Sequence, residues 1–176
     1  MKIRFAAPAD AMDIANVHVE TWRTTYRGMM PDKLLDNLSL ATRGNFWVGY
    51  LNNPPEGAFV LVAEDEAGEI AGFANAGPPR PEIKDFESEL YAIYVLEKQQ
   101  GKGTGRKLVE ATARELERRG KRSMMLWVLK ENEGSRRFYE ALGGQLLDEQ
   151  QFEIGDTTLT EVGYGWQDIN VLSGKS

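Results

Sequence analysis

The 176-residue sequence predicts an α/β protein in which helices flank a mixed β-sheet within one domain. Apolar residues at helical spacing alternate along the chain with short runs of strand-forming residues. No internal repeat or linker divides the chain. A chain of this length buries about 70% of the surface that it exposes when unfolded, which is enough to form one hydrophobic core.

The first third of the chain is expected to be mainly helical. After a strand at residues 2–5, Pro8 suits the first turn of a helix that runs to about Tyr26 and stops at Gly28. Its apolar stripe, with members three and four residues apart, consists of Ala11, Ile14, Ala15, His18 and Trp22. A second helical stretch begins at Pro31, and Ser39 can cap a third.

The remaining elements follow from the same two periodicities, with glycines and prolines at the turns. In chain order they are a hairpin of residues 59–63 and 70–74, an irregular loop at 77–81, a strand at 90–95, a helix at 106–119, a strand at 124–129, a helix at 135–142 and a closing hairpin of residues 145–154 and 158–166.

Composition excludes several classes of function. The formal charge of −6 argues against binding to nucleic acid or to an anionic membrane surface, since both need a basic surface. Because the chain has no cysteine, it can form neither a disulfide framework nor an enzyme thioester. With no signal peptide and no apolar run long enough to span a bilayer, the expected location is cytoplasmic.

A glycine-rich loop lies between the strand at 90–95 and the helix at 106–119. Its residues are Gln100, Gly101, Lys102, Gly103, Thr104 and Gly105. Glycines let the backbone approach an anion closely, and the unpaired N–H groups of a helix N-terminus attract phosphates. Four cations surround the loop, namely Lys98, Lys102, Arg106 and Lys107. The loop is therefore a candidate pyrophosphate site, and the alternative is a glycine-rich turn with ordinary surface lysines.

The spacing excludes two familiar nucleotide motifs. A Walker A loop needs Ser or Thr after its lysine, but Gly103 follows Lys102. A dinucleotide-binding fingerprint that began at Gly101 would need a small residue in place of Arg106.

The loop does match Gln/Arg-x-x-Gly-x-Gly, and together with the preceding Ile93-Tyr94-Val95 it resembles the acetyl-CoA loop of the GNAT superfamily. The run from Asn132 to Gly143 resembles the second GNAT signature, in which an asparagine is followed seven positions later by the tyrosine of Phe-Tyr, here Tyr139, and then by a glycine. Gly144 departs from the pattern because an aromatic residue usually packs there, and we expect a looser joint before Gln145.

The resemblance implies a GNAT-like single domain over residues 1–172, with a mostly antiparallel sheet of about seven strands, followed by a flexible tail at 173–176. It implies an N-acetyltransferase that moves an acetyl group from acetyl-CoA to a primary amine of a small molecule or peptide. The backbone of Ile93, Tyr94 and Val95 would pair with pantetheine, and the Val95 N–H would act as the oxyanion donor.

Two side chains of the second signature receive roles from the same resemblance. Tyr139 would be the general acid that protonates the departing thiolate, and Asn132 would position the cofactor. The alternatives are that Tyr139 is a core aromatic residue and that Asn132 is a helix cap.

The general base is harder to assign. Some relatives have a glutamate five residues before the motif asparagine, but this chain has Trp127 there. Glu89 ranks first, with Tyr91 as the other candidate, since both lie on one face of the predicted strand beside the acetyl site and either could relay a proton through water. The alternative is that these residues belong to a solvated edge or to core packing. His18 is expected to be structural and is a reserve base. No metal site is expected, because the chain has one histidine and no cysteine.

The acceptor cannot be named from the sequence. Glu82, Asp85, Glu87 and Glu89 form an acidic approach that would suit a cationic amine, although a hydrated acidic loop is the simpler interpretation. A non-catalytic acyl-CoA-binding sensor is the alternative function, and an ATP-binding regulator is disfavoured by the Walker spacing. Members of the superfamily are often dimers, so a homodimer is left open.

Overall fold

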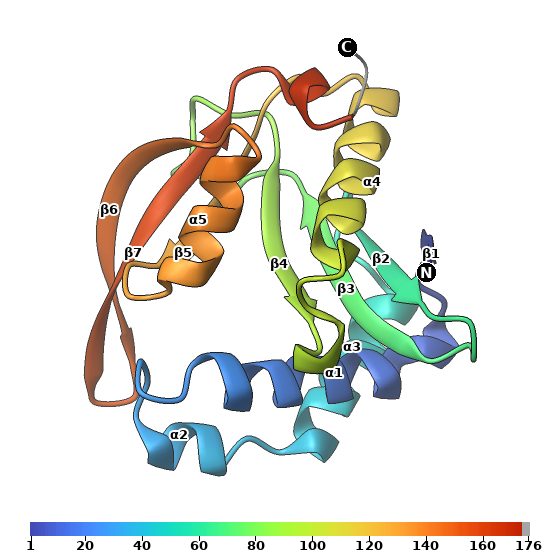
Figure 1. Ribbon diagram of the computed structural model, residues 1–176, viewed down its shortest axis with the longest axis vertical. Helices are drawn as coiled ribbons and strands as arrows, with labels where there is room; N and C mark the ends of the chain where they lie inside the picture. Colours follow the sequence, from blue (N-terminus) through green and yellow to red (C-terminus); the bar gives the residue numbers. More distant parts are fainter. Residues whose placement is uncertain (174–176) are drawn as a thin grey trace. The chain divides into compact units, whose positions relative to one another are not determined.

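Seven strands form one sheet in the computed structural model, which describes residues 1–173 (Figure 1). The strands are hydrogen-bonded in the order β1-β2-β3-β4-β5-β7-β6. The pairs β1–β2, β2–β3, β5–β7 and β6–β7 are antiparallel, whereas β4 and β5 pair in parallel with Glu89 opposite Met125. The predicted mixed, mostly antiparallel sheet with flanking helices is confirmed.

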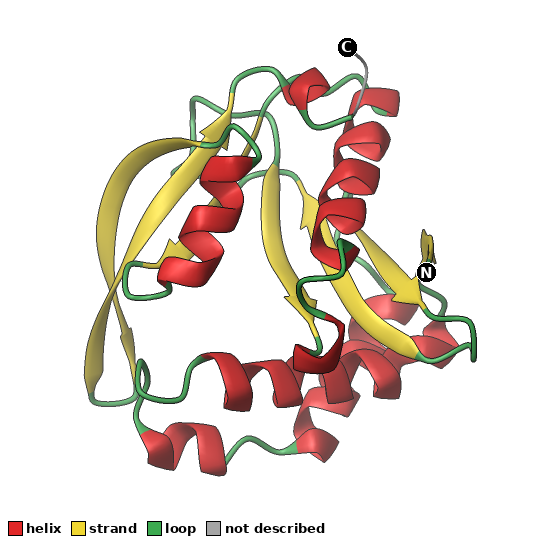
Figure 2. Ribbon diagram, in the orientation of Figure 1, coloured by secondary structure: helices red, strands yellow, loops and turns green. Residues whose placement is uncertain are grey.

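The helices and strands follow one another along the chain in the expected order (Figure 2). The strands are β1 Lys2–Phe5, β2 Phe59–Glu64, β3 Ile70–Gly77, β4 Glu89–Val95, β5 Met124–Leu129, β6 Gln145–Ile154 and β7 Thr157–Trp166. The helices are α1 Ala11–Thr25, α2 Asp32–Asp36, α3 Leu40–Asn52, α4 Thr104–Arg118 and α5 Glu133–Ala141. Short 3₁₀ turns occupy Pro8–Asp10, Glu97–Gln99 and Ile169–Val171.

The chain divides into two compact units. The N-terminal unit comprises Met1–Ala76 and Ala92–Thr112, and the C-terminal unit comprises Gly77–Tyr91 and the chain from Ala113 onward. β4 and α4 contribute residues to both units. The domain limits of 1–172 stay a prediction. Ser173 is buried and its hydroxyl donates to the Asn170 carbonyl over 3.1 Å, and the rest of the expected tail, residues 174–176, lies outside the described residues.

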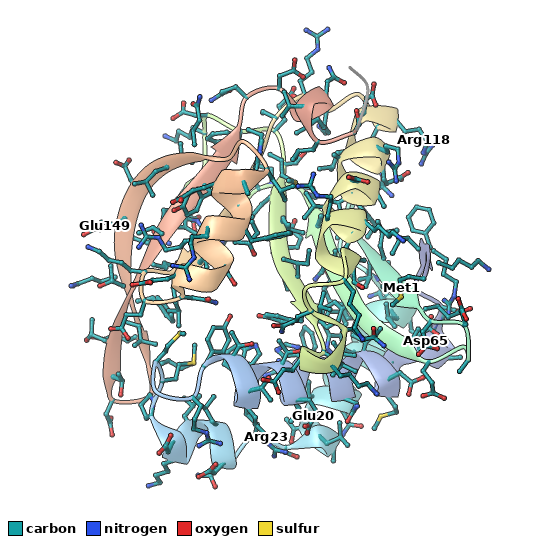
Figure 3. The ribbon with its side chains drawn as sticks, viewed as in Figure 1. Met1, Glu20, Arg23, Asp65, Arg118 and Glu149 are labelled. Carbon is teal, nitrogen blue, oxygen red and sulfur yellow. The ribbon has the colours of Figure 1, made fainter. Side chains whose placement is uncertain are left out.

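The core of the N-terminal unit forms where α1 and α3 pack against β2 and β3. Ile14, Trp47, Val62 and Phe73 are its largest members with almost no exposed surface. The apolar stripe predicted for the first helix accounts for this burial, because its members are on one face of α1. Figure 3 labels Glu20 and Arg23, which belong to the polar part of the same helix.

The start of α1 differs from the prediction. Pro8 opens a 3₁₀ turn, and the α-helix begins three residues later at Ala11. The Asp10 carboxylate holds this turn: it accepts from the Ala7 N–H at 2.7 Å and from the Arg4 guanidinium at 2.7 Å. The hydrogen bond from Arg4 keeps the pKa of Asp10 below its usual value. The turn thus fixes where α1 begins.

In the C-terminal unit, α5 packs against β7. The Trp166 indole N–H donates to the Leu142 carbonyl at 3.0 Å, just beyond the end of α5. The same indole occupies the space beside Gly144, where an added Cβ would lie 2.8 Å from its ring. The looser joint expected at Gly144 is therefore wrong, because Trp166 supplies the missing aromatic ring from a distant strand. β6 and β7 form the predicted closing hairpin, which turns at Gly155 with φ of 59°.

No helix within residues 1–173 is long and apolar enough to cross a membrane.

Candidate functional site

The glycine-rich loop of the N-terminal unit begins where β4 ends at Val95. After the 3₁₀ turn Glu97–Gln99, the Gln100 side-chain amide donates to the Val95 carbonyl at 2.9 Å. Gly101 and Gly103 adopt φ values of 69° and 82°, a region that favours glycine. The side chain of Gln100 thus ties the loop to the end of β4, while the two glycines set the path of its backbone.

α4 starts inside this loop, at Thr104, two residues before the predicted start. The first four N–H groups of an α-helix have no acceptor within the helix and point outward from its end. The N-terminus therefore presents backbone donors at Thr104, which is buried, and Gly105. A Cβ added at Gly101 or Gly103 would meet no other atom within 4 Å, so the loop backbone is accessible from outside.

Exposed cations surround the same loop. They are Lys98, Lys102, Arg106 and Lys107. None of these four side chains forms an ion pair with a carboxylate of residues 1–173. Backbone donors at a helix N-terminus and cations without partners are the groups that a pyrophosphate requires. The residues present at the predicted loop therefore fit the diphosphate of a CoA ester.

The end of β4 lies very close to β3. A Cβ added at Gly72 would be 2.7 Å from the Tyr94 carbonyl oxygen and 3.3 Å from the Val95 Cα. The Leu96 N–H donates to the Ala71 carbonyl at 2.9 Å, which keeps the two strands together beyond Val95. Gly72 therefore allows the strand that contains Ile93, Tyr94 and Val95 to approach its neighbour.

His18 lies in an aromatic cluster beside this part of β4. Its ring is 5.1 Å from the ring of Tyr94, 5.6 Å from Trp22 and 6.1 Å from Trp47, measured between centroids. The Trp47 indole N–H donates to His18 Nδ1 at 3.3 Å. Burial, with a smaller effect of the Arg43 charge, lowers the pKa of His18 to about 3. The neutral ring therefore carries its proton on Nε2, where it donates rather than accepts.

In the C-terminal unit, Asn132 caps α5. Its Oδ1 accepts from the Ser135 N–H at 3.1 Å, and the side chain is 5% exposed. The cap interpretation of this residue is therefore correct. Its side-chain NH₂ group makes no hydrogen bond with any described residue, so the same amide has two donors left for a ligand.

Tyr139 lies on α5 and is buried, with 7% of its surface exposed. Its ring is 5.3 Å from that of Phe138, 6.0 Å from Tyr164 and 6.4 Å from Trp166. Tyr164 is itself engaged, since its hydroxyl donates to Glu140 Oε1 at 2.5 Å and accepts from Arg136 Nε at 3.2 Å. Aromatic packing thus fixes the Tyr139 ring in one position.

Glu89, at the start of β4 in the C-terminal unit, is almost fully buried. Arg80 donates to its Oε1 through Nη2 at 2.7 Å and through Nε at 2.9 Å, and the Arg80 backbone N–H donates to Oε2 at 3.0 Å. Glu89 raises the pKa of the Arg80 guanidinium through these hydrogen bonds. Tyr91, by contrast, is exposed, and its hydroxyl donates to the Pro78 carbonyl.

The sequence did not indicate that Arg80 pairs with Glu89. Arg80 lies in a loop predicted to be irregular, nine residues before Glu89, and no periodicity relates the two positions. The predicted site residues thus divide between the units: the loop and the end of β4 belong to the N-terminal unit, and Glu89, Asn132 and Tyr139 belong to the C-terminal unit.

Residues 17–144 match the model of the acetyltransferase (GNAT) family. The chain is 41% identical over 170 residues to the uncharacterized N-acetyltransferase YuaI of Bacillus subtilis, covering 97% of this chain and 95% of that protein. It is 31% identical over 147 residues to the L-methionine sulfoximine/L-methionine sulfone acetyltransferase of Salmonella typhimurium, covering 81% of this chain and 79% of that protein.

Solved structures share the fold at lower identity. The PaiA N-acetyltransferase of Thermoplasma acidophilum, in complex with coenzyme A, is 21% identical with a TM-score of 0.69, covering 91% of this chain and 96% of that chain. The YncA acetyltransferase of Salmonella typhimurium, with acetyl-CoA, is 24% identical with a TM-score of 0.69, covering 95% and 93%. The match to the family model spans both signature motifs, and the chain therefore belongs to the GNAT family of acetyltransferases.

Proposed function

We propose that this acetyltransferase uses acetyl-CoA as its acyl donor and passes the acetyl group directly to a primary amine of a small molecule or peptide. The observation that carries this proposal is the loop from Gln100 to Gly105, where helix donors and unpaired cations meet. The chain has no cysteine, so the acetyl group cannot be held as an enzyme thioester on the way to the amine.

Acetyl-CoA would supply an activated acetyl thioester, and the N-terminal unit would hold it. The N–H groups from Gly101 to Gly105, together with Lys102, would bind the diphosphate. Backbone groups of Ile93 and Tyr94 would pair with the pantetheine arm. The Val95 N–H would donate to the thioester oxygen as negative charge develops there.

Tyr139 would act as general acid and protonate the departing thiolate. A phenol with an ordinary pKa near ~10 donates to a thiolate whose parent thiol has a pKa near ~8.5, which is uphill by about one to two units. Packing of the Tyr139 ring against Tyr164 and Trp166 supports this role, since a general acid must be held in one orientation. Asn132 would bind the cofactor through its side-chain NH₂ group.

Glu89 would take the proton from the attacking amine, directly or through a water molecule. A carboxylate has about four acceptor positions, and Arg80 occupies three of those on Glu89. One acceptor position on Glu89 Oε2 therefore stays available for the proton of the amine. Removing the base by Glu89→Gln should lower the turnover number by about 10²-fold or more while acetyl-CoA still binds. Glu87→Gln is the matched control, and an unchanged rate in Glu89→Gln would eliminate this base.

The test of the proposed function is acetyl-CoA-dependent release of CoA thiol in the presence of polyamines, amino acids, amino sugars and short peptides. The chain contributes no thiol background because it has no cysteine. The Salmonella relative named for L-methionine sulfoximine and L-methionine sulfone supports including both compounds in the panel. Failure to bind acetyl-CoA would overturn the proposal, and tight binding without turnover of any amine would point to an acyl-CoA sensor.

The variant Tyr139→Phe tests the acid role within the same assay. We expect its turnover number to fall about 10²-fold or more. Tyr164→Phe is the control, since it removes a neighbouring hydroxyl from the same aromatic group. Equal activity of Tyr139→Phe and the wild type would show that Tyr139 is only a packing residue. The homodimer and the cytoplasmic location stay predictions from the sequence.

A further inference from the structure

The aromatic cluster of the N-terminal unit contains polar hydrogens that the fold does not use. The Trp22 indole N–H is buried, and no acceptor within residues 1–173 meets the distance and angle of a hydrogen bond. Buried donors are almost always paired in folded proteins, and leaving one unpaired costs about 1–3 kcal/mol. An unpaired buried N–H at a partly exposed side chain therefore indicates a place where a ligand acceptor fits.

His18 supplies a second donor in the same cluster. Trp47 occupies Nδ1, so the neutral ring carries its hydrogen on Nε2, and Nε2 makes no hydrogen bond with any residue that the structure describes. The ring centroids of His18 and Trp22 are 5.6 Å apart. The two side chains are also separated by four residues on α1, which places them one turn apart on the same face.

A cation without a partner lies on the adjacent helix. The Arg43 guanidinium on α3 is above the Phe46 ring, with 5.6 Å between Cζ and the ring centre. It forms no ion pair with a carboxylate of residues 1–173. Its charge acts on the cluster, since it adds to the effect of burial in lowering the pKa of His18 and partly offsets the rise that burial causes in the pKa of Tyr94. Arg43 is thus half-buried, has no carboxylate partner among residues 1–173, and is close enough to His18 to act on it electrostatically.

Tyr94 connects these groups to the predicted acetyl site. Its ring is 5.1 Å from that of His18 and is partly exposed. Burial raises the pKa of its hydroxyl, so the hydroxyl stays protonated at neutral pH. This hydroxyl lies near the Trp22 indole N–H, but the two groups do not meet the distance and angle of a hydrogen bond. The backbone of the same residue belongs to the strand segment expected to bind the thioester arm. An acceptor molecule held by this cluster would have its amine near the acetyl group.

We propose that Arg43, Trp22 and His18 form a subsite for the carboxylate of an amino-acid-type acceptor, whose amine receives the acetyl group. A carboxylate offers up to four acceptor positions and a full negative charge, which matches one guanidinium and two N–H donors. A cationic polyamine would instead place a second ammonium group beside Arg43. The proposal rests on the acetyltransferase function proposed above and adds the chemical class of the acceptor.

The test compares each L-amino acid with its own amide and its decarboxylated amine, using CoA release as the readout. Two or three charge-assisted hydrogen bonds should make kcat/KM at least about 100-fold higher for the acid of the preferred side chain. Arg43→Gln should lower kcat/KM for that acid by about 100-fold, with a change of less than about threefold for the amide and no change in acetyl-CoA affinity. Arg43→Lys should recover part of the loss.

Arg118→Gln is the matched control, because Arg118 has the same side chain but already pairs with Glu115 near the end of α4 (Figure 3). Trp22→Phe keeps the ring and removes only the N–H, and we expect about a tenfold loss for the acid. Equal rates for acid, amide and amine, or an Arg43→Gln enzyme that still distinguishes them, would overturn the proposal.

Binding without turnover separates this inference from the function on which it rests. Trp22 and Trp47 lie in the cluster, so their fluorescence should change when the amino acid is added without acetyl-CoA. Carboxylate-dependent and Arg43-dependent binding in a protein that acetylates no amine would support the subsite and contradict the enzyme function. Acetylation of amines at a rate that does not depend on the presence of a carboxylate would support the function and contradict the subsite.

Discussion

The Trp47 indole N–H donates to His18 Nδ1 across 3.3 Å and so joins α3 to α1 within the N-terminal unit. This contact fixes the tautomer of the chain's only histidine. It also orients the ring so that the opposite nitrogen faces away from Trp47. A residue on a buried helical stripe thus keeps a polar hydrogen beside Trp22 and Tyr94.

The lowered pKa of His18 predicts a pH-dependent stability. The unfolded chain binds a proton on His18 below about pH 6.5, whereas the folded protein does not until about pH 3. Unfolding therefore takes up a proton in this window, and the free energy of unfolding falls by up to about 1.4 kcal/mol per pH unit. Between pH 7 and pH 5 we expect a loss of about 2 kcal/mol, measured by urea denaturation.

A His18→Phe variant provides the control for this measurement. Because the chain has no second histidine, no other side chain has an ordinary pKa between pH 7 and pH 5. The variant should show a nearly flat dependence between pH 7 and pH 5, whatever its absolute stability. The same slope in variant and wild type would show that His18 is protonated normally in the fold.

Gly144 predicts a steric effect in the C-terminal unit. An alanine Cβ there would lie 2.8 Å from the Trp166 ring and 2.9 Å from the Tyr139 carbonyl, which is backbone and cannot move aside. Gly144→Ala should cost about 1–3 kcal/mol of stability, measured by thermal or denaturant unfolding.

Gly134→Ala is the matched control for that change. It is a helical glycine of α5, and the nearest atom to an added Cβ is Asn132 Oδ1 at 3.9 Å. Alanine favours the helix by about 1 kcal/mol, so this variant should be as stable as the wild type or more so. If Gly144→Ala were equally well tolerated, Trp166 would not pack as described.

Local patterns were enough to predict β5 and β6, whose limits agree with the expected 124–129 and 145–154. Such strands are determined by local features, namely the hydrophobic periodicity of the strand and the turn residues within a few positions of its ends. The Glu89–Arg80 pair and the Gly144–Trp166 contact could not be found in this way, because tertiary packing brings these residues together. The unpaired Trp22 N–H is of the same kind: the sequence places Trp22 on a buried stripe but does not show whether its polar atom has a partner.

The close approach of β3 and β4 predicts a loss of cofactor affinity in Gly72→Ala. The added Cβ would be 2.7 Å from the Tyr94 carbonyl oxygen, so β4 would have to move at the segment proposed to bind pantetheine. We expect the Kd for acetyl-CoA to rise about tenfold, measured by calorimetry. Gly49→Ala on α3 is the control, because its Cβ would meet no atom within 4 Å. An unchanged Kd in Gly72→Ala would separate this segment of β4 from cofactor binding.

A comparison of alanine variants at Gly103 and Gly68 separates the proposed phosphate binding of the loop from the effect of backbone strain. Gly103 and Gly68 have φ values of 82° and 86°, and a Cβ at either position would contact nothing within 4 Å. Alanine therefore carries the same conformational cost of about 1–2 kcal/mol at both sites. Gly68 lies in the turn between β2 and β3, where its N–H donates to the Asp65 carbonyl at 3.1 Å.

If the loop binds the diphosphate of acetyl-CoA, only the Gly103 variant adds a side chain where an anion approaches the backbone. Both variants should then lose similar stability in urea, while the Kd for acetyl-CoA rises at least about tenfold in Gly103→Ala and stays unchanged in Gly68→Ala. A Kd that rises equally in both variants would mean that general destabilisation weakens binding. A Kd unchanged in both would place the diphosphate elsewhere and remove the main support for the proposed acyl donor.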